Sequence, residues 1–185
     1  MNELSLNILD IVENSISAGA SIIEIEIYED TVSDILKINI IDNGCGIPKD
    51  KIKHVLDPFY TSRKTRRVGL GLPLIKQVAN DCGGDIKIES EKGHTCVSIW
   101  MKYSHIDRPP IGNITDTIIT ILVSNNNIDL IYKHYYNDKN FSFSTIDLKK
   151  VLGEQVPLNI PIVIEFIKKE INEGLANLYG GVRKL

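Results

Sequence analysis

Hydrophobic residues recur with a helical period at the start of the chain and with a period of two in the segments that follow. Residues 4–18 place their apolar side chains on one broad face of a helix, opposite a narrow polar stripe. Residues 21–30 and 35–42 alternate apolar and polar positions, which is typical of strands with one buried face. The start of the chain is therefore predicted to form a helix and two strands.

The same two patterns return further along the chain. Residues 69–84 have helical spacing, with Pro73 tolerated in the first turn and a glycine pair at the end. Residues 85–103 alternate on both sides of a turn, which predicts two more strands. We expect an α+β fold for residues 1–104, a two-layer sandwich in which helices cover one sheet.

Residues 111–185 contain a second run of predicted elements. Residues 115–124, 128–136 and 141–144 are interpreted as a three-stranded meander with polar turns between the strands. Two helices follow, of which the second is amphipathic over residues 161–178. This C-terminal α+β module is either a second small domain or an extension of the first, and its expected role is to bind a partner.

The overall composition is typical of a globular protein without a membrane segment. Of the 185 residues, 43% are hydrophobic and 24% are charged. No apolar run reaches the about 18 residues of a membrane span, and the first residues lack a leader pattern, so we expect a cytoplasmic protein. The three cysteines lack metal-binding spacing and are interpreted as reduced thiols.

Positive charge is concentrated in one stretch, although the chain has a net charge of -3. Residues 49–76 contain eight Lys and Arg residues against two Asp residues. A stretch of this kind forms a solvated loop or binds an anion, and nucleic acid is a third alternative.

Four short polar patches follow one another in the first half of the chain. They are Asp10 with Asn14, residues 42–46, residues 57–64 and residues 69–72. Each has a simple explanation when taken alone, since an asparagine on a helix is commonly solvated and a G-x-G sequence is commonly a turn. Their order and spacing together resemble the ATP-binding domain of the GHKL superfamily. That superfamily includes DNA gyrase, the heat-shock chaperone of this class, sensor histidine kinases and mismatch-repair ATPases.

The four patches match the sequence boxes of this superfamily over about residues 3–103. The asparagine box is similar to ILDIVENSISAGA, the first glycine box to DNGCGIP, the phenylalanine box to DPFYTSR, and the second glycine box to GLGLPLIKQVANDCGGDIKIES. The resemblance implies a Bergerat-type ATP-binding fold with ATP and Mg²⁺ as ligands. Other nucleotide motifs do not fit, because the sequence lacks GxxxxGK[ST] and no strand directly precedes GLGL.

The sequence DNG after the second predicted strand is a strong hairpin signal, yet no further strand follows it directly. A carboxylate at a strand end beside glycines can instead accept a hydrogen bond from an exocyclic amine, while the bare backbone admits a flat ring. The resemblance implies that Asp42 binds the amine of adenine. The other contacts to the base are assigned in the same way to Gly44, Gly46 and Ile47, with a bridging contact from Thr95.

Asp10 and Asn14 lie one helical turn apart, so their side chains project from the same face of the first helix. An amide oxygen is a suitable ligand for Mg²⁺, which also holds phosphates and keeps several waters. The resemblance implies this role for Asn14. It places Asp10 where hydrolysing relatives carry a glutamate that activates water, so Asp10 is either a general base or an outer partner of Mg²⁺.

The basic stretch ends at a glycine-led helix, and free N–H groups at the start of a helix favour an anion. The resemblance implies that the triphosphate lies here, which favours the anion-binding alternative over nucleic acid. The implied contacts come from Tyr60, Arg63, Lys64, Arg67, Gly69, Leu70, Gly71 and Leu72. Core packing is the favoured alternative for Tyr60, although it lies in a named box. Arg67 with Val68 replaces the first Gly-x of the kinase pattern.

Three activities remain open from the resemblance. The preferred one is a kinase that transfers the γ-phosphate of ATP to a separate partner protein. In this case the acceptor is expected on a partner, because few residues precede the asparagine box, where a histidine kinase carries its phosphoacceptor helices. The alternatives are an ATP-hydrolysing conformational switch that uses Asp10, and a nucleotide-sensing module with little turnover.

The expected partner is an unidentified phosphoacceptor or regulated protein. The junction SHIDRPP makes the chain similar to a bacterial group associated with iron-hydrogenase operons, which adds a hydrogenase-associated partner to the expectations. Neither a membrane nor nucleic acid is an expected partner. The oligomeric state, a homodimer included, stays open.

Overall fold

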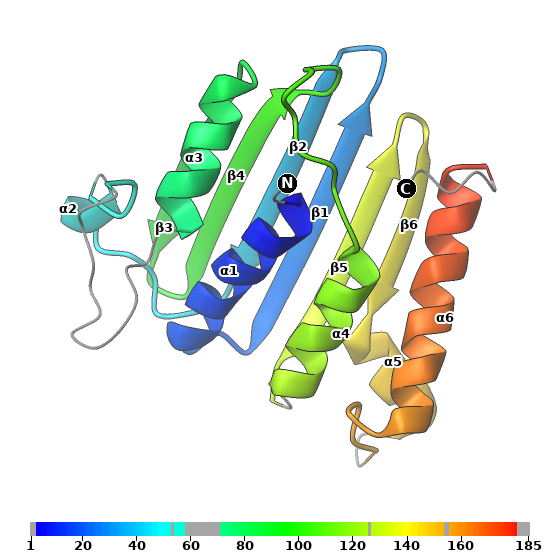
Figure 1. Cartoon of the computed structure of the whole chain (residues 1–185). Coiled ribbons are helices and arrows are strands. Elements are labelled where there is room, and N and C mark those ends of the chain that lie inside the picture. The colour runs from blue at the N-terminus through cyan, green and yellow to red at the C-terminus, as the bar shows by residue number, and fades with distance from the viewer. Residues whose placement is uncertain (1–2, 53, 58–70, 126, 154–155, 181–185) are drawn as a thin grey trace.

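The computed structural model describes residues 3–52, 54–57, 71–125, 127–153 and 156–180. Within these residues six strands form one sheet, in the order β3-β4-β2-β1-β5-β6, and the long helices lie on one of its faces (Figure 1). The strands are β1 (Ile22–Asp30), β2 (Ile35–Asp42), β3 (Asp85–Glu91), β4 (His94–Lys102), β5 (Asp129–Tyr136) and β6 (Lys139–Ser144). The helices are α1 (Leu4–Ser17), α2 (Lys49–Ile52), α3 (Gly71–Asp81), α4 (Ile114–Ser124), α5 (Thr145–Leu152) and α6 (Pro161–Leu178).

The first part of the chain confirms the predicted α+β sandwich. Strand β2 lies between β1 and β4 and runs antiparallel to both, and β3 is the antiparallel neighbour of β4. The alternating residues of β1 face the helices as predicted, with Ile23, Ile25 and Ile27 fully buried. Helices α1 and α3 cover this half of the sheet and contact each other.

The predicted three-stranded meander is wrong at its first element, because residues 115–124 belong to helix α4. The many β-branched residues of this segment suggested a strand, but its buried positions follow a helical spacing that includes Ile114, Ile118 and Ile121. Asn113 caps the helix by accepting a hydrogen bond from the Asp116 N–H at 3.0 Å. Packing of an apolar helical face therefore outweighs local strand propensity here.

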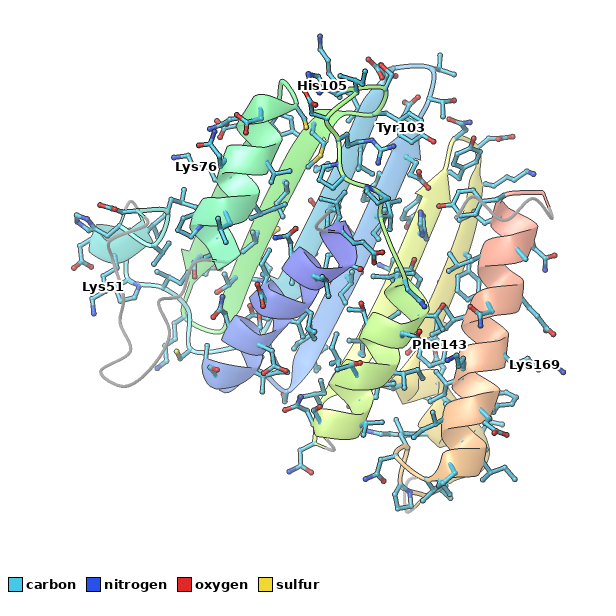
Figure 2. The ribbon with its side chains drawn as sticks, in the orientation of Figure 1. Lys51, Lys76, Tyr103, His105, Phe143 and Lys169 are labelled. Atoms are coloured by element: carbon cyan, nitrogen blue, oxygen red, sulfur yellow. The ribbon has the colours of Figure 1, made fainter. Side chains whose placement is uncertain are left out.

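The remaining two strands of the expected meander extend the first sheet. Strand β5 pairs with β1 in parallel, from Ile22 opposite Asp129 to Glu29 opposite Tyr136, and β6 closes the edge as the antiparallel neighbour of β5. Phe143 of β6 is buried under the helices, whereas Lys169 of α6 is exposed (Figure 2). One hydrophobic core spans both parts of the chain, with Ile11 and Ile38 in the same cluster as Ile118 and Ile167. The C-terminal elements therefore extend the first sheet and share its core.

Candidate functional site

The carboxylate of Asp42 is buried at the end of β2 and is held by two donors. Asp42 as a whole residue is only 6% exposed. The Ser15 hydroxyl of α1 donates to Asp42 Oδ2 at 2.7 Å, and the Gly44 N–H donates to Asp42 Oδ1 at 2.8 Å. An ionised carboxylate offers about four acceptor positions, so this carboxylate retains acceptor capacity for a further donor.

A chain of hydroxyl groups connects the neighbouring strand to the loop after β2. Thr95 of β4 lies directly opposite Asp42 in the sheet. Its hydroxyl is 2.9 Å from that of Ser90, and the Ser90 hydroxyl accepts a hydrogen bond from the Ile47 N–H at 2.8 Å. We call the group of Asp42, Gly44, Gly46, Ile47 and Thr95 the Asp42 corner.

Gly46 stands where a side chain does not fit. Its φ of +80° lies in the left-handed region, and a Cβ atom built there meets the Glu91 carbonyl oxygen at 2.2 Å. At Gly44 a Cβ atom meets Asp42 Oδ1 at 2.9 Å. The two glycines therefore let the loop pass close to the β3–β4 turn and to the buried carboxylate.

Asn43 explains why the DNG sequence does not form a hairpin. Its side-chain oxygen accepts hydrogen bonds from the N–H groups of Ser21 and Ile22 at 2.8 and 2.9 Å, at the start of β1. The Cys45 N–H donates to the Ala18 carbonyl at 3.0 Å. The loop is thus tied to the end of α1, and β2 finds its partners in β1 and β4.

Helix α1 carries the two polar residues of the predicted asparagine box. Asn14 is exposed and directly precedes Ser15, which holds Asp42. Asp10 lies beside the start of α3, because a Cβ atom built at Gly71 is 3.6 Å from Asp10 Oδ2. Partial burial raises the pKa of the Asp10 carboxyl above its usual value. The structure thus places Asp10 beside the start of α3 and leaves Asn14 on the exposed side of α1, next in sequence to Ser15.

The structure brings together only part of the predicted phosphate site. Gly71 is buried at the first position of α3, and Leu72 beside it is half-buried. The other expected contacts lie outside the described residues, and these are Tyr60, Arg63, Lys64, Arg67, Gly69 and Leu70.

Two serines of the site were not predicted from the sequence. Ser15 occupies a position on the buried face of α1, in helical register with Ile8, Ile11 and Val12. A polar residue at such a position is a signal for a buried hydrogen bond, although the pattern does not identify the partner. Ser90 carries no comparable signal, because its position in β3 is half-buried among alternating residues.

Two further observations limit the chemistry of the described part of the chain. No group of three or more His, Cys, Asp or Glu residues there is arranged to hold a metal ion. Among the same residues, every helix is too short or too polar to cross a membrane.

Residues 2–105 match the model of the family described as Histidine kinase-, DNA gyrase B-, and HSP90-like ATPase. Sporulation kinase C of Bacillus subtilis is 34% identical over 92 residues, which make up 50% of this chain and 21% of that kinase. The signal transduction histidine-protein kinase AtoS of Escherichia coli is 38% identical over 95 residues, 51% of this chain and 15% of that kinase. The match thus spans about a fifth or less of each kinase.

One solved structure shows a related fold, and a second is similar at a lower score. The N-terminal domain of a DNA repair protein superposes with a TM-score of 0.52 at 17% identity, covering 78% of this chain and 52% of that chain. The catalytic domain of the histidine kinase ThkA gives a TM-score of 0.44 at 23% identity, over 54% of this chain and 65% of that chain.

Proposed function

Because the chain belongs to the family of histidine kinase-, DNA gyrase B- and HSP90-like ATPases, and residues 2–105 form its histidine kinase-like ATPase domain, we propose that it binds ATP with Mg²⁺ and transfers the γ-phosphate to a separate partner protein. The observation that carries the proposal is the buried, two-donor carboxylate of Asp42 at the glycine-rich end of β2.

Adenine is the group that the Asp42 corner is built to accept. Asp42 receives the exocyclic amine, since its carboxylate is fixed by Ser15 and Gly44 and keeps acceptor capacity. Thr95 stands opposite Asp42 and supplies a hydroxyl that both donates and accepts. A buried carboxylate that needs a donor discriminates strongly against a base that presents a carbonyl at the same position.

The phosphates extend from this corner along α1 toward the start of α3. Asn14 is the ligand for Mg²⁺ on the exposed side of α1, and the ion neutralises phosphate charge when it is bound. The N-terminus of α3 at Gly71 favours an anion, and Asp10 faces this end of the helix. The basic residues between 63 and 67 complete the phosphate site in this proposal.

Two measurements test the proposal. Calorimetry with ATP and Mg²⁺ measures binding, and the absence of binding heat would contradict the whole assignment. Incubation with γ-labelled ATP and Mg²⁺, with and without an extract of the source cells, then follows the label. A labelled extract protein that appears with the wild-type chain and not with Asp42→Asn supports transfer to a partner. Label on the chain itself contradicts a separate acceptor.

ATP hydrolysis is the second candidate function, and one observation favours it. The raised pKa of Asp10, beside the start of α3, is the property of a carboxylate that takes a proton from water. In the same incubation, hydrolysis releases free phosphate, and Asp10→Asn abolishes that release while ATP still binds. Tight binding with neither labelled protein nor free phosphate identifies a nucleotide sensor.

A further inference from the structure

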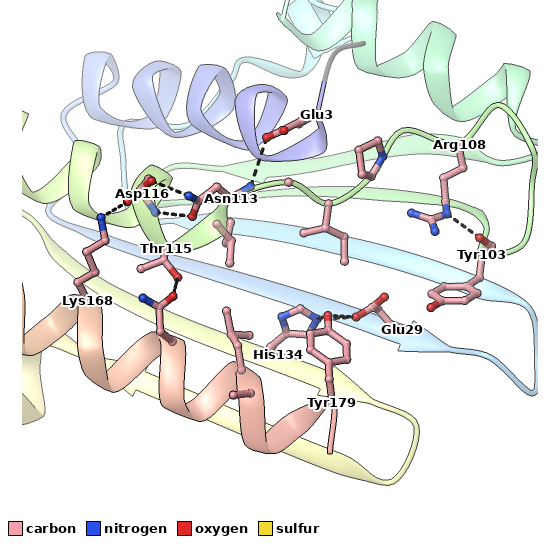
Figure 3. Close-up of a pocket in the computed structure, with 17 residues that line it drawn as sticks. Glu3, Glu29, Tyr103, Arg108, Asn113, Thr115, Asp116, His134, Lys168 and Tyr179 are labelled. Atoms are coloured by element: carbon pink, nitrogen blue, oxygen red, sulfur yellow. Dashed lines mark hydrogen bonds and ion pairs between the residues drawn. The ribbon is translucent and has the colours of Figure 1, made fainter. Parts of the chain in front are cut away.

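A pocket lies far from the Asp42 corner, between the segment 103–113, α4 and α6 (Figure 3). Its volume is about 640 Å³, within the range of sites that hold small organic molecules. Glu29 lies in its floor, six residues along β1 from Ile23, which pairs with Asp42. At about 3.3 Å per residue, the two sites are about 20 Å apart along the sheet.

Polar side chains lie in the floor of the pocket, at helix-facing strand positions where the alternating pattern predicts apolar core residues. Glu29 follows the buried residues Ile25 and Ile27 on the helix-facing side of β1, and His134 follows Tyr132 on the same side of β5. Glu29 is 5% exposed and His134 is 1% exposed. Two ionisable groups at core positions lower stability unless they are bonded, so their presence here calls for a reason.

These groups form one hydrogen-bonded network. His134 Nε2 is 3.0 Å from Glu29 Oε1, and His134 Nδ1 is 2.5 Å from the Tyr132 hydroxyl. The Tyr179 hydroxyl, at the end of α6, donates to Glu29 Oε1. Burial and the nearby Glu29 carboxylate raise the pKa of Tyr179, which keeps this hydroxyl protonated as a donor. Among the described residues, no Lys or Arg forms an ion pair with Glu29.

The opposite wall carries a cation, Arg108, that has no acidic partner within the described part of the chain. Arg108 Nε and Nη1 donate to the carbonyl groups of Tyr103 and Pro109 at 2.5 and 3.0 Å, and the guanidinium lies over the Tyr103 ring. A guanidinium has five N–H donors in a planar fork that suits a carboxylate. The other cation of the lining, Lys168, is already paired with Asp116 at 2.8 Å.

The pocket therefore combines one buried carboxylate, one guanidinium and an apolar wall. The apolar surface comes from Pro110, Ile111, Ile114, Leu175 and Ala176. Glu29 Oε1 is already in contact with His134 and Tyr179, but no hydrogen bond to Glu29 Oε2 is found among the described residues, and the Arg108 guanidinium has no acidic partner there. A ligand with a single charge would pair with only one of these two groups. A ligand with both charges satisfies each of them.

We propose that this pocket binds a small zwitterionic molecule with an apolar body, such as an α-amino acid with an apolar side chain, whose carboxylate pairs with Arg108 and whose ammonium group faces Glu29. The apolar body packs on Ile111 and Leu175. The segment 103–113 and α6 both line the pocket, so the ligand joins the ATPase domain to the C-terminal elements.

Matched probes test the need for both charges. L-phenylalanine and L-leucine are titrated into the full chain without nucleotide, and binding is followed by calorimetry and ligand-observed NMR. Phenethylamine and 3-phenylpropanoate lack the carboxylate and the ammonium group of phenylalanine, respectively. We expect an amino acid to bind and each single-charge analogue to bind at least about tenfold more weakly. No binding of either amino acid, or equal binding of an analogue, overturns the proposal.

Three variants locate the binding. Glu29→Gln keeps the shape and removes the charge, Arg108→Gln removes the cation, and Ala176→Phe fills the pocket from α6. Each is expected to weaken amino-acid binding by about tenfold or more. Lys87→Gln, on the exposed surface of β3, is the control and is expected to bind as the wild type does. Binding that survives all three pocket variants overturns the assignment to this pocket.

Discussion

At the scale of single residues, the site depends on side chains whose partners come from distant parts of the sequence. Asp42 and Ser15 are 27 positions apart, and their contact fixes a carboxylate between α1 and β2. Ile47 and Ser90 are 43 positions apart and join the loop to β3 in the same way. Such contacts make the corner rigid before any ligand enters it, which reduces the entropy lost on binding.

Asp42→Asn is expected to weaken ATP binding by about 10- to 100-fold, because it replaces a charge-assisted acceptor with a neutral amide. The amide NH₂ group also faces one of the two donors that Asp42 binds in the wild type, because the Ser15 hydroxyl and the Gly44 N–H donate to different oxygens of the carboxylate. Calorimetry at fixed salt and Mg²⁺ measures the loss. Asp138→Asn, in the exposed β5–β6 turn, is the matched control. An unchanged dissociation constant for Asp42→Asn would remove Asp42 from the adenine site.

Gly46 and Gly93 allow steric contact to be separated from backbone strain. Both have φ near +80°, but a Cβ atom at Gly93 meets nothing within 4 Å, whereas one at Gly46 meets the Glu91 carbonyl at 2.2 Å. Gly93→Ala is expected to lower the free energy of unfolding by about 1 to 2 kcal/mol. Gly46→Ala adds the displacement of backbone and should lower it further. Urea unfolding of both variants makes the comparison, and equal losses would contradict the close approach at Gly46.

At the scale of elements, α1 couples the two halves of the proposed nucleotide site. One turn of the helix holds Asp42 through Ser15, and the turn before it places Asp10 against the start of α3. A small rotation of α1 would therefore move both contacts together. In the proposed function, α1 would therefore connect the base end and the phosphate end of the nucleotide site.

The raised pKa of Asp10 gives this helix contact a dependence on pH. Because burial favours the protonated carboxyl in the folded state, its stabilising contribution is present below the unfolded pKa and is lost as pH rises through the raised folded value. The side chain of Asp10→Asn stays neutral, so this variant does not lose stability in this way as pH rises. The stability of Asp10→Asn relative to the wild type should therefore increase between about pH 3 and pH 7. Urea midpoints across this range test it, with Asp138→Asn as control, and a parallel pH profile for wild type and Asp10→Asn would contradict it.

The sequence predicts elements well where local pattern and packing agree, and fails where they differ. The periods of α1, β1 and β2 are sufficient for the first half of the fold, and the first glycine box contains Asp42, Gly44, Gly46 and Ile47 of the Asp42 corner. The strand prediction for residues 115–124 is wrong because β-branched residues favour strands, whereas in the structure the apolar face of this helix packs against α1 and α6. Ser90 could not be found either, since its role follows from strand register across β3 and β4. Register and helix docking are tertiary properties that local patterns do not contain.

At the scale of the whole molecule, the ATPase domain and the C-terminal elements share one sheet and one core. The parallel pairing of β1 with β5 makes β1 an interior strand, and α4 lies between α1 and α6. Without this extension, the backbone edge of β1 and the apolar side of α1 would face water. Folding of the two parts is therefore expected to be one cooperative event.

Ile167→Ala in α6 tests this cooperativity across the molecule. Ile167 is fully buried, so its truncation should lower the free energy of unfolding by about 2 to 5 kcal/mol. The single tryptophan, Trp100, lies in β4, in the half of the sheet away from β5 and β6, and reports on the ATPase domain. If the core is one unit, Trp100 fluorescence and far-UV circular dichroism shift to lower urea by the same amount. Phe166→Ala, at the exposed side of the same helix turn, is the control and should shift neither signal by more than about 0.5 kcal/mol. A Trp100 transition that stays at the wild-type midpoint while the circular dichroism signal splits would show that the C-terminal elements unfold alone.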